Sequence, residues 1–251
     1  MADNDIVFIT GATSGFGEAC ARAFAAQGAR LVLTGRREER LRALKAELKT
    51  QVHTVVLDVR DNAAVERAVK DLPREFSDVT ILLNNAGLAL GLGPAHKVSL
   101  QDWETMVDTN IKGVLYVTRA LLPGMVERNR GHIINLGSVA GTYPYPGGNV
   151  YGATKAFLHQ FTMNLKADLV GTRVRVTTIE PGMAETEFSL VRFGGDAEKA
   201  RAVYQGMQPL TPQDIADAVL WCATRPAHVN INAIEIMPVA QGFSPFAVHR
   251  G

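Results

Sequence analysis

Short runs of β-branched and aliphatic residues alternate with longer amphipathic segments along the whole chain. β-Branched runs of about four to eight residues favour strands, and apolar positions that recur every three or four residues favour helices. Strands are predicted at 5–10, 30–34, 52–57, 79–83, 173–179 and 233–237, with a further strand-like run that ends before residue 138. Helices are predicted at 18–27, 62–72, 100–127 and 150–169, with a charged helix that ends near residue 49 and another that opens at 211–214.

This alternation predicts one α/β domain, built on a parallel sheet with helices on both faces. No internal repeat, linker or low-complexity segment interrupts it. In such a sheet the carboxyl ends of the strands meet at one edge, where ligands bind. The residues expected at that edge are Gly11, Thr34, Asp58, Asn84, Ser138 and Pro181.

The first predicted strand ends in a glycine-rich turn that leads into an alanine-rich helix. This order is typical of a dinucleotide site, because glycines let the backbone approach a pyrophosphate that faces the helix N-terminus. The glycine spacing differs from the common G-x-G-x-x-G, so the strand before the turn and the helix after it are needed to support the prediction. The loop residues expected to bind the cofactor are Gly11, Thr13, Ser14, Gly15, Phe16 and Gly17.

The end of the second strand indicates NADP rather than NAD. An NAD site places an acidic residue there for the ribose hydroxyls, whereas this chain has Thr34 and Gly35, followed by Arg36 and Arg37. Guanidinium groups bind the additional phosphate of NADP with charge-assisted hydrogen bonds. The alternative is that the two arginines pair with the glutamates at 38–39 on a solvated face.

Two further strand ends supply candidate cofactor contacts. Asp58, followed by Val59, is placed to accept a hydrogen bond from an adenine amino group, and a helix N-cap role is the alternative. The fourth strand runs into Asn84, and Asn85, Ala86 and Gly87 can line the cofactor ribose.

Tyr151 and Lys155 are candidates for acid–base chemistry. Residues four apart share one face of a helix, so the ammonium can lie beside the phenol and favour its ionised form. Ser138 precedes a Gly/Pro-rich bend that can return its hydroxyl toward the phenol. The alternative is an amphipathic helix start with a lysine that extends to solvent. Asn110 lies in the middle of the predicted helix 100–127, where asparagine is unfavourable and indicates a local kink or a special role.

The last third of the chain contains a candidate substrate region. Residues 185–210 are irregular, contain Gly194 and Gly195, and are expected to form a lid over the site. The tail 239–251 carries Phe243, Phe246 and Val248, so we expect it to pack, either within the chain or on another subunit.

Composition narrows the function classes. The 26 basic and 25 acidic residues nearly cancel, so no overall field favours nucleic acid or an anionic membrane. No apolar run approaches a membrane span, and the start lacks signal-peptide features, so we expect a cytoplasmic protein. Cys20 and Cys222 are expected in the core, and no spacing indicates a metal site.

Together these residues resemble the short-chain dehydrogenase/reductase family over essentially the whole chain. The matching elements are the loop Thr-Gly-x-x-x-Gly-x-Gly from Thr10, residues 84–87, Asn110, Ser138, the Tyr151/Lys155 pair and Pro181-Gly182. The resemblance implies a doubly wound, seven-stranded Rossmann sheet, a homotetramer and a catalytic tetrad of Asn110, Ser138, Tyr151 and Lys155. It also implies that Tyr151, Lys155, Pro181 and Gly182 contact the cofactor, and that Ile179 and Thr186 hold the nicotinamide carboxamide.

Within the family, the chain is most similar to NADP-dependent 3-hydroxy acid dehydrogenases, which include enzymes acting on L-serine and L-allo-threonine. The resemblance rests on segments at 15–18, 34–37, 85–91, 145–151, 185–192 and 237–239. Tyr151 would be the general acid/base and Ser138 would hold the reacting oxygen. Lys155 would lower the Tyr151 pKa, and Asn110 would anchor a water.

A 3-hydroxy acid brings a carboxylate, for which Arg192 is the candidate partner, and Tyr143, Asn149 and Glu185 would line the rest of the site. For Arg192 the alternative is a surface ion pair with Asp196 or Glu198. Two other functions stay open: a carbonyl reductase for substrates without a carboxylate, and a non-enzymatic NADP-binding regulator.

Overall fold

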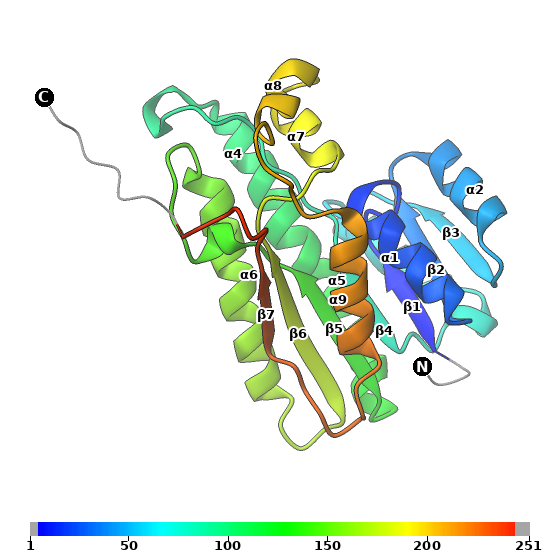
Figure 1. Cartoon of the computed structure of the whole chain (residues 1–251). Coiled ribbons are helices and arrows are strands. Elements are labelled where there is room, and N and C mark those ends of the chain that lie inside the picture. Colours follow the sequence, from blue (N-terminus) through cyan, green and yellow to red (C-terminus); the bar gives the residue numbers. More distant parts are fainter. Residues whose placement is uncertain (1–4, 244–251) are drawn as a thin grey trace, which may run out of the picture.

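The computed structural model describes residues 5–243 and contains one seven-stranded sheet (Figure 1). Each pair of neighbouring strands is parallel, and their order is β3-β2-β1-β4-β5-β6-β7. The strands are β1 (Ile6–Ile9), β2 (Arg30–Gly35), β3 (Val52–Val56), β4 (Ile81–Asn84), β5 (Gly131–Leu136), β6 (Val174–Pro181) and β7 (Ala233–Ile236). The predicted seven-stranded, doubly wound parallel sheet is confirmed.

Alternate residues of the strands enter two separate hydrophobic layers. On one face, Val7 and Ile9 of β1 belong to a cluster with α1 (Gly15–Ala26), α2 (Glu38–Glu47) and α9 (Pro212–Ala223). On the other face, Ile6 and Phe8 belong to a cluster with α3 (Asn62–Lys70), α5 (Gly113–Glu127) and α6 (Asn149–Asp168). Cys20 and Cys222 are free thiols buried in the first layer, as expected.

The chain reverses direction across the sheet between β1 and β4, which lie side by side although β2 and β3 come between them in sequence. Ligands of doubly wound sheets bind at the carboxyl ends of the strands beside such a reversal. Short 3₁₀ turns complete the connections: η1 (Arg74–Phe76), η2 (Ala95–Lys97) and η4 (Val139–Gly141).

The helix predicted at 100–127 is interrupted near its middle. It consists of α4 (Leu100–Val107), a π-helical turn η3 (Asp108–Lys112) and α5. π-Turns inside α-helices occur frequently at functional sites. Asn110 lies in this turn, so the kink that its position suggested has a defined form.

Residues 185–210 cross the edge of the sheet at which the strands end (Figure 1). This segment, here named the α7–α8 segment, contains α7 (Glu187–Arg192) and α8 (Ala197–Ala202). Gly194, Gly195 and Gly206 have positive φ angles, which glycine adopts without strain. Within 5–243, no helix is long and apolar enough to cross a membrane.

Part of the C-terminal tail packs on the same chain. The side-chain oxygen of Gln241 accepts a hydrogen bond of 2.7 Å from the backbone N–H of Met183, and the rings of Phe243 and Tyr143 lie 4.8 Å apart. Phe246 and Val248, for which packing was also expected, lie outside the described residues.

Candidate active site

Two adjoining cavities open at the edge of the sheet where the strands end. The larger, of about 530 Å³, lies over the ends of β5 and β6, and the smaller, of about 280 Å³, lies over the ends of β1, β2 and β3. Five residues line both cavities: Phe16, Asn85, Gly87, Thr186 and Phe188. The two cavities therefore form one cleft, in which a dinucleotide in the smaller cavity can present one end to the larger.

The turn between β1 and α1 is held in place by the residue that follows β4. Asn85 donates from its side-chain amide to the carbonyl oxygens of Thr10 and Gly11, at 2.8 and 3.0 Å. A Cβ atom on Gly17 would lie 2.4 Å from the Gly11 carbonyl oxygen, and Gly15 has a φ of 54°. This close backbone approach leaves room beside the start of α1, which fits a pyrophosphate group.

Arg36 and Arg37 have different surroundings. Arg37 donates to the side-chain oxygens of Thr13 and Ser14, at 3.0 and 2.8 Å, and pairs with Glu187 at 2.9 Å. Arg36 is exposed, lines the smaller cavity and has no hydrogen bond or ion pair within the described part of the chain. The alternative pairing with the glutamates at 38–39 is wrong for Arg37, because its carboxylate partner comes from the α7–α8 segment.

Asp58 and Val59 also line the smaller cavity. The Asp58 carboxylate accepts hydrogen bonds from Arg60, the shortest at 2.6 Å, and these bonds hold its pKa below the usual value. The N-cap of α3 is Asp61, which accepts from the backbone N–H of Ala64. The alternative N-cap role for Asp58 is therefore wrong, and its carboxylate stays at the cavity.

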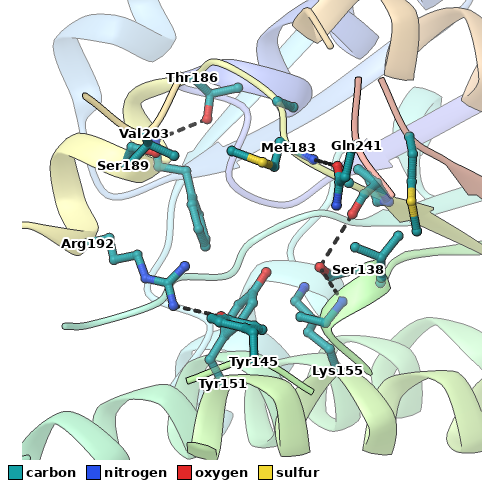
Figure 2. A pocket seen from close by; sticks show the side chains of 18 of the residues that line it. Ser138, Tyr145, Tyr151, Lys155, Met183, Thr186, Ser189, Arg192, Val203 and Gln241 are labelled. Atoms are coloured by element: carbon teal, nitrogen blue, oxygen red, sulfur yellow. Dashed lines mark hydrogen bonds between the residues drawn. The ribbon is translucent and has the colours of Figure 1, made fainter. Parts of the chain in front are cut away.

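Ser138, Tyr151 and Lys155 line the larger cavity together (Figure 2). Ser138 follows β5, and the other two lie in the first two turns of α6. Lys155 is only 7% exposed, and its ammonium donates a hydrogen bond of 2.7 Å to the Leu136 carbonyl oxygen. The alternative of a lysine that extends to solvent is therefore wrong.

Burial dominates the acid–base properties of these groups. It raises the pKa of Tyr151 to about 12, while a hydrogen bond with Ser138 and the charge of Arg192 act in the lowering direction. It also lowers the pKa of Lys155 to about 8. The expectation that Lys155 lowers the Tyr151 pKa is not met here: burial raises that pKa, and the groups that act in the lowering direction are Ser138 and Arg192.

Asn110 lies beneath this group and does not line either cavity. Its side chain is buried, accepts from the Leu88 N–H at 2.9 Å, and donates to the Leu88 carbonyl and the Thr154 hydroxyl at 2.8 and 3.1 Å. A Cβ atom on Gly87 would lie 3.3 Å from the Asn110 side-chain oxygen and 3.7 Å from the Lys155 nitrogen. Asn110 from η3 and Lys155 from α6 therefore approach the same residue of the short loop after β4, although a bridging water is still a prediction.

Arg192 lies at the cavity opposite Lys155 (Figure 2). Its guanidinium donates to the Tyr145 hydroxyl at 2.6 Å and to the Gly91 carbonyl at 3.2 Å, and it lies 5.6 Å from the centre of the Tyr151 ring. Asp196, its alternative partner, instead caps α8 and pairs with Lys199. The sequence-based alternative of a surface ion pair is therefore wrong.

Three expected contacts need correction. Asn149 does not line either cavity, because its amide bonds the Trp103 indole, the Gly93 carbonyl and the Val150 N–H. Glu185 is exposed outside both cavities. Ile179, expected at the carboxamide, is fully buried in β6, where its carbonyl accepts from the Gly137 N–H.

Other expected residues do line the cleft. Tyr143, Pro181 and Gly182 border the larger cavity, and Gly11, Thr13, Ser14, Gly15 and Ala86 border the smaller one. Sequence reasoning missed Tyr145 and Phe188, whose ring lies 5.6 Å from that of Tyr151, and Gln241 from the tail. Tyr145 belongs to the bend between Ser138 and Tyr151, which was a usable signal, whereas nothing local singled out Phe188. Within 5–243, no group of three or more His, Cys, Asp or Glu residues could hold a metal ion.

Comparison with known proteins gives consistent matches. The model of the short chain dehydrogenase family matches residues 5–192. The chain is 62% identical over 246 residues to the NADP-dependent 3-hydroxy acid dehydrogenase YdfG of Salmonella typhi, covering 98% of this chain and 99% of that protein. It is 58% identical over 250 residues to sulfoacetaldehyde reductase 2 of Chromohalobacter salexigens, covering 98% and 99%. The closed form of a serine dehydrogenase complexed with NADP+ matches with a TM-score of 0.96 at 59% identity, covering 98% of this chain and 100% of the other.

Proposed function

The chain belongs to the short chain dehydrogenase family, and we propose that it is an NADP-dependent oxidoreductase that oxidises the 3-hydroxyl of short 3-hydroxy acids and reduces the corresponding carbonyls. The observation that carries this proposal is the position of Arg192. A guanidinium group borders the same cavity as Tyr151, Ser138 and Lys155, so a cation and an acid–base group face one space. A short substrate with an anionic end can contact both.

The smaller cavity would hold NADP. The glycine turn would receive the pyrophosphate, Asp58 the adenine, and Arg36 with Thr13 and Ser14 the additional phosphate. Gly35 supports this choice over NAD, because it leaves no carboxylate at the end of β2 to repel that phosphate. Bound NADP supplies the hydride acceptor for alcohol oxidation.

Tyr151 would remove the proton from the substrate hydroxyl during oxidation and return it during reduction. Ser138 would donate a hydrogen bond to the reacting oxygen and hold it near the phenol. A base is most effective when its pKa lies near the working pH, so the raised pKa of Tyr151 has to fall when the site is filled. The positive charge of Arg192 already acts in that direction. Asn110 would anchor a water that connects Lys155 to solvent, so that the proton can leave.

Arg192 would bind the substrate carboxylate through charge-assisted hydrogen bonds. Tyr145 accepts a hydrogen bond from the same guanidinium and would keep it aimed into the cavity. In 3-hydroxypropionate and L-serine, one carbon separates the carboxylate from the reacting carbon, so the clamp would also fix which carbon meets Tyr151.

A second candidate is the reduction of a short sulfonated aldehyde. Sulfoacetaldehyde has the same spacing between its anionic group and its reacting carbon, and a relative of 58% identity is named for that reaction. Arg192 would bind a sulfonate by the same contacts. This version belongs to the open alternative of a carbonyl reductase for substrates without a carboxylate.

A substrate panel tests the proposal directly. Turnover of 3-hydroxypropionate, L-serine, 2-hydroxyethanesulfonate and 2-propanol would be followed through the absorbance of the reduced nicotinamide, with NADP and with NAD. We expect kcat/KM with NADP to be highest for the acids and lowest for 2-propanol. Equal values for 2-propanol and 3-hydroxypropionate would refute the clamp, and no turnover of any compound would favour the non-enzymatic regulator.

We also propose a homotetramer in the cytoplasm, as the family resemblance and the sequence suggested. Exposed apolar side chains such as Leu100, Val170 and Trp221 support an assembly. Light scattering coupled to size-exclusion chromatography would measure the assembly size, and a monomeric mass would contradict it.

A further inference from the structure

Helix α7 borders both halves of the cleft, the smaller cavity proposed for the cofactor and the larger cavity proposed for the substrate. Its first residue, Glu187, lies at the smaller cavity, and its last residue, Arg192, lies at the larger one. Phe188 and Ser189, between them, also line the larger cavity. A single six-residue helix therefore touches both the cofactor half and the substrate half.

Glu187 is held by two arginines from the cofactor half. Arg37 contacts one carboxylate oxygen at 2.9 Å, and Arg40 contacts the two oxygens at 2.7 and 3.0 Å. Hydrogen bonds from both guanidinium groups hold the pKa of Glu187 below its usual value. Because Arg37 also bonds Thr13 and Ser14, this network joins the glycine turn to α7.

The α7–α8 segment has further attachments to the rest of the chain: the Arg192 carbonyl accepts from the Gly91 N–H at 3.0 Å, the Phe188 ring lies 5.6 Å from that of Tyr151, and the Leu210 N–H donates to the Met183 carbonyl at 3.0 Å. The Tyr204 hydroxyl lies 2.6 Å from that of Ser189 and donates to the Ala184 carbonyl at 2.7 Å, so these bonds join α7 only to the segment itself and to the residue just before it. Gly194, Gly195 and Gly206 provide positions of positive φ on either side of α8. The position of α7 thus depends on the contacts of Glu187 at its start and of Arg192 at its end, together with the packing of Phe188 between them.

The balance of charges around Glu187 allows the cofactor phosphate to bind while Glu187 stays in place. Arg36, Arg37 and Arg40 carry three positive charges at this corner of the smaller cavity, and Glu187 carries one negative charge. A phosphate monoester carries up to about two negative charges at neutral pH. The sum is then close to zero, so the phosphate completes the network and need not displace Glu187.

We propose that Glu187 is a positioning residue whose ion pairs with Arg37 and Arg40 hold α7 in place and thereby fix Arg192 at the substrate cavity. The phosphorylated cofactor and the acidic substrate then bind cooperatively, although their sites lie in different halves of the cleft. This coupling rests on the proposed function, because it assigns the substrate anion to Arg192. It adds a specificity role for a residue that touches neither the reacting atoms nor the substrate.

The test compares Glu187→Gln with Glu198→Gln, which removes the same charge from α8 of the same segment. For Glu187→Gln we expect KM for 3-hydroxypropionate to rise about three- to tenfold, the range that a partly exposed ion-pair network supports, with kcat within about twofold. KM for the neutral substrate 2-propanol should stay unchanged, because it does not use Arg192. Glu198→Gln should behave as the unmodified protein, and Glu187→Asp should restore part of the loss.

Arg40→Gln should reproduce the effect, and the double variant with Glu187→Gln should be no worse than either single change. Equal increases in KM for 3-hydroxypropionate and 2-propanol would indicate general damage and overturn the proposal. So would additive effects in the double variant.

Limited proteolysis, which needs no substrate, tests this proposal separately from the assignment of the substrate. NADPH should slow tryptic cleavage at Lys199 and Arg201, which lie on α8, and Glu187→Gln should remove most of that protection. Protection that survives in Glu187→Gln overturns the positioning role whatever the substrate is. If Glu187→Gln loses the protection and the unmodified protein does not prefer acids, the proposed substrate is refuted. The link between Glu187 and the segment is then still supported.

Discussion

The ammonium nitrogen of Lys155 lies 5.9 Å from the centre of the Tyr151 ring and donates its hydrogen bond to the carbonyl oxygen of Leu136. Both side chains are almost fully buried, so each favours its neutral form more than it would in water. At neutral pH the phenol of Tyr151 is uncharged, whereas the mainly protonated Lys155 carries a desolvation cost. That cost makes Lys155 measurable through the pH dependence of stability.

The first prediction concerns Lys155 and alkaline pH. Its folded pKa of about 8 lies below the usual value of about 10.4, so between these values the unfolded chain binds more protons. The contribution of Lys155 to stability is thus present above about pH 10.4 and is lost as pH falls toward 8, a change of up to about 3 kcal/mol. Urea unfolding would be measured for the protein and for Lys155→Met at pH 7.5 to 10 and fixed concentration. The free energy of unfolding of the unmodified protein, relative to that of Lys155→Met, should increase as pH rises.

The difference curve is needed because the two cysteines act in the opposite direction. Burial raises the pKa of Cys20 and of Cys222, so their contribution to stability falls as pH rises above the usual thiol value. A difference between the two proteins that does not vary with pH would contradict the lowered pKa of Lys155.

The second prediction concerns Tyr151. Tyr151→Phe removes the proton-transfer group and keeps the ring that packs against Phe188, so NADPH affinity should be retained. Turnover should fall by about 10²- to 10⁴-fold, the usual contribution of a positioned acid–base group. Steady-state kinetics and NADPH fluorescence titration measure the two effects. Tyr116→Phe on α5 is the matched control, and a near-normal rate for Tyr151→Phe would remove its assigned role.

The third prediction concerns Arg192. Arg192→Gln should raise KM for 3-hydroxypropionate by about ten- to a hundredfold, because hydrogen bonds to charged groups contribute about 1.5 to 3 kcal/mol. KM for 2-propanol should change little. Arg201→Gln, on the exposed side of the same segment, serves as the control. If neither substrate distinguishes Arg192→Gln from the unmodified protein, the carboxylate is bound elsewhere.

The fourth prediction concerns Arg36. It has no ion-pair partner within the described residues, so Arg36→Ala removes the proposed phosphate contact without breaking a hydrogen bond or ion pair in the protein. KM for NADP should rise about tenfold or more, and KM for NAD should stay within about twofold. Arg42→Ala, which breaks an exposed pair with Glu38 on α2, controls for loss of charge. Equal changes for both cofactors would mean that Arg36 does not read the phosphate.

The fifth prediction concerns Asn110. Asn110→Ala leaves both backbone groups of Leu88 without their partner, which should destabilise the protein by about 2 to 3 kcal/mol. The Leu88 amide should also exchange its hydrogen faster. Asn164→Ala, which removes an exposed side-chain bond with Gln160, is the control. An unchanged urea midpoint in Asn110→Ala would contradict a structural role for the π-turn.

Sequence patterns predicted the features that depend on local spacing. The alternation of strands and helices, the glycine turn and the placement of Tyr151 and Lys155 all follow from short-range periodicity and strand order. Features that join distant segments were not predictable in this way. Arg37 and Glu187 are 150 residues apart, and no local signal distinguishes Glu187 from other acidic residues in the segment.

Polar side chains also have competing uses that a sequence does not rank. Asn149 lies two residues before Tyr151 and was expected to contact substrate, yet its amide makes hydrogen bonds to the Trp103 indole and to two backbone groups. For Asn110 the sequence was informative, because an asparagine in the middle of a predicted helix marked the position of the π-turn η3. In both places the amide bonds backbone groups that are distant in sequence, Gly93 for Asn149 and Leu88 for Asn110, and only the three-dimensional structure brings them together.

The bonds from Asn85 to the carbonyls of Thr10 and Gly11 mean that the glycine-rich loop is shaped by a residue that follows β4, outside the loop and its own strand. If residues 10–17 were transplanted into another scaffold, the glycines would keep the loop flexible, but the Asn85 amide that fixes its shape would be missing. A protein engineer who grafts this loop would have to bring the neighbouring amide as well, or supply an equivalent donor from the host.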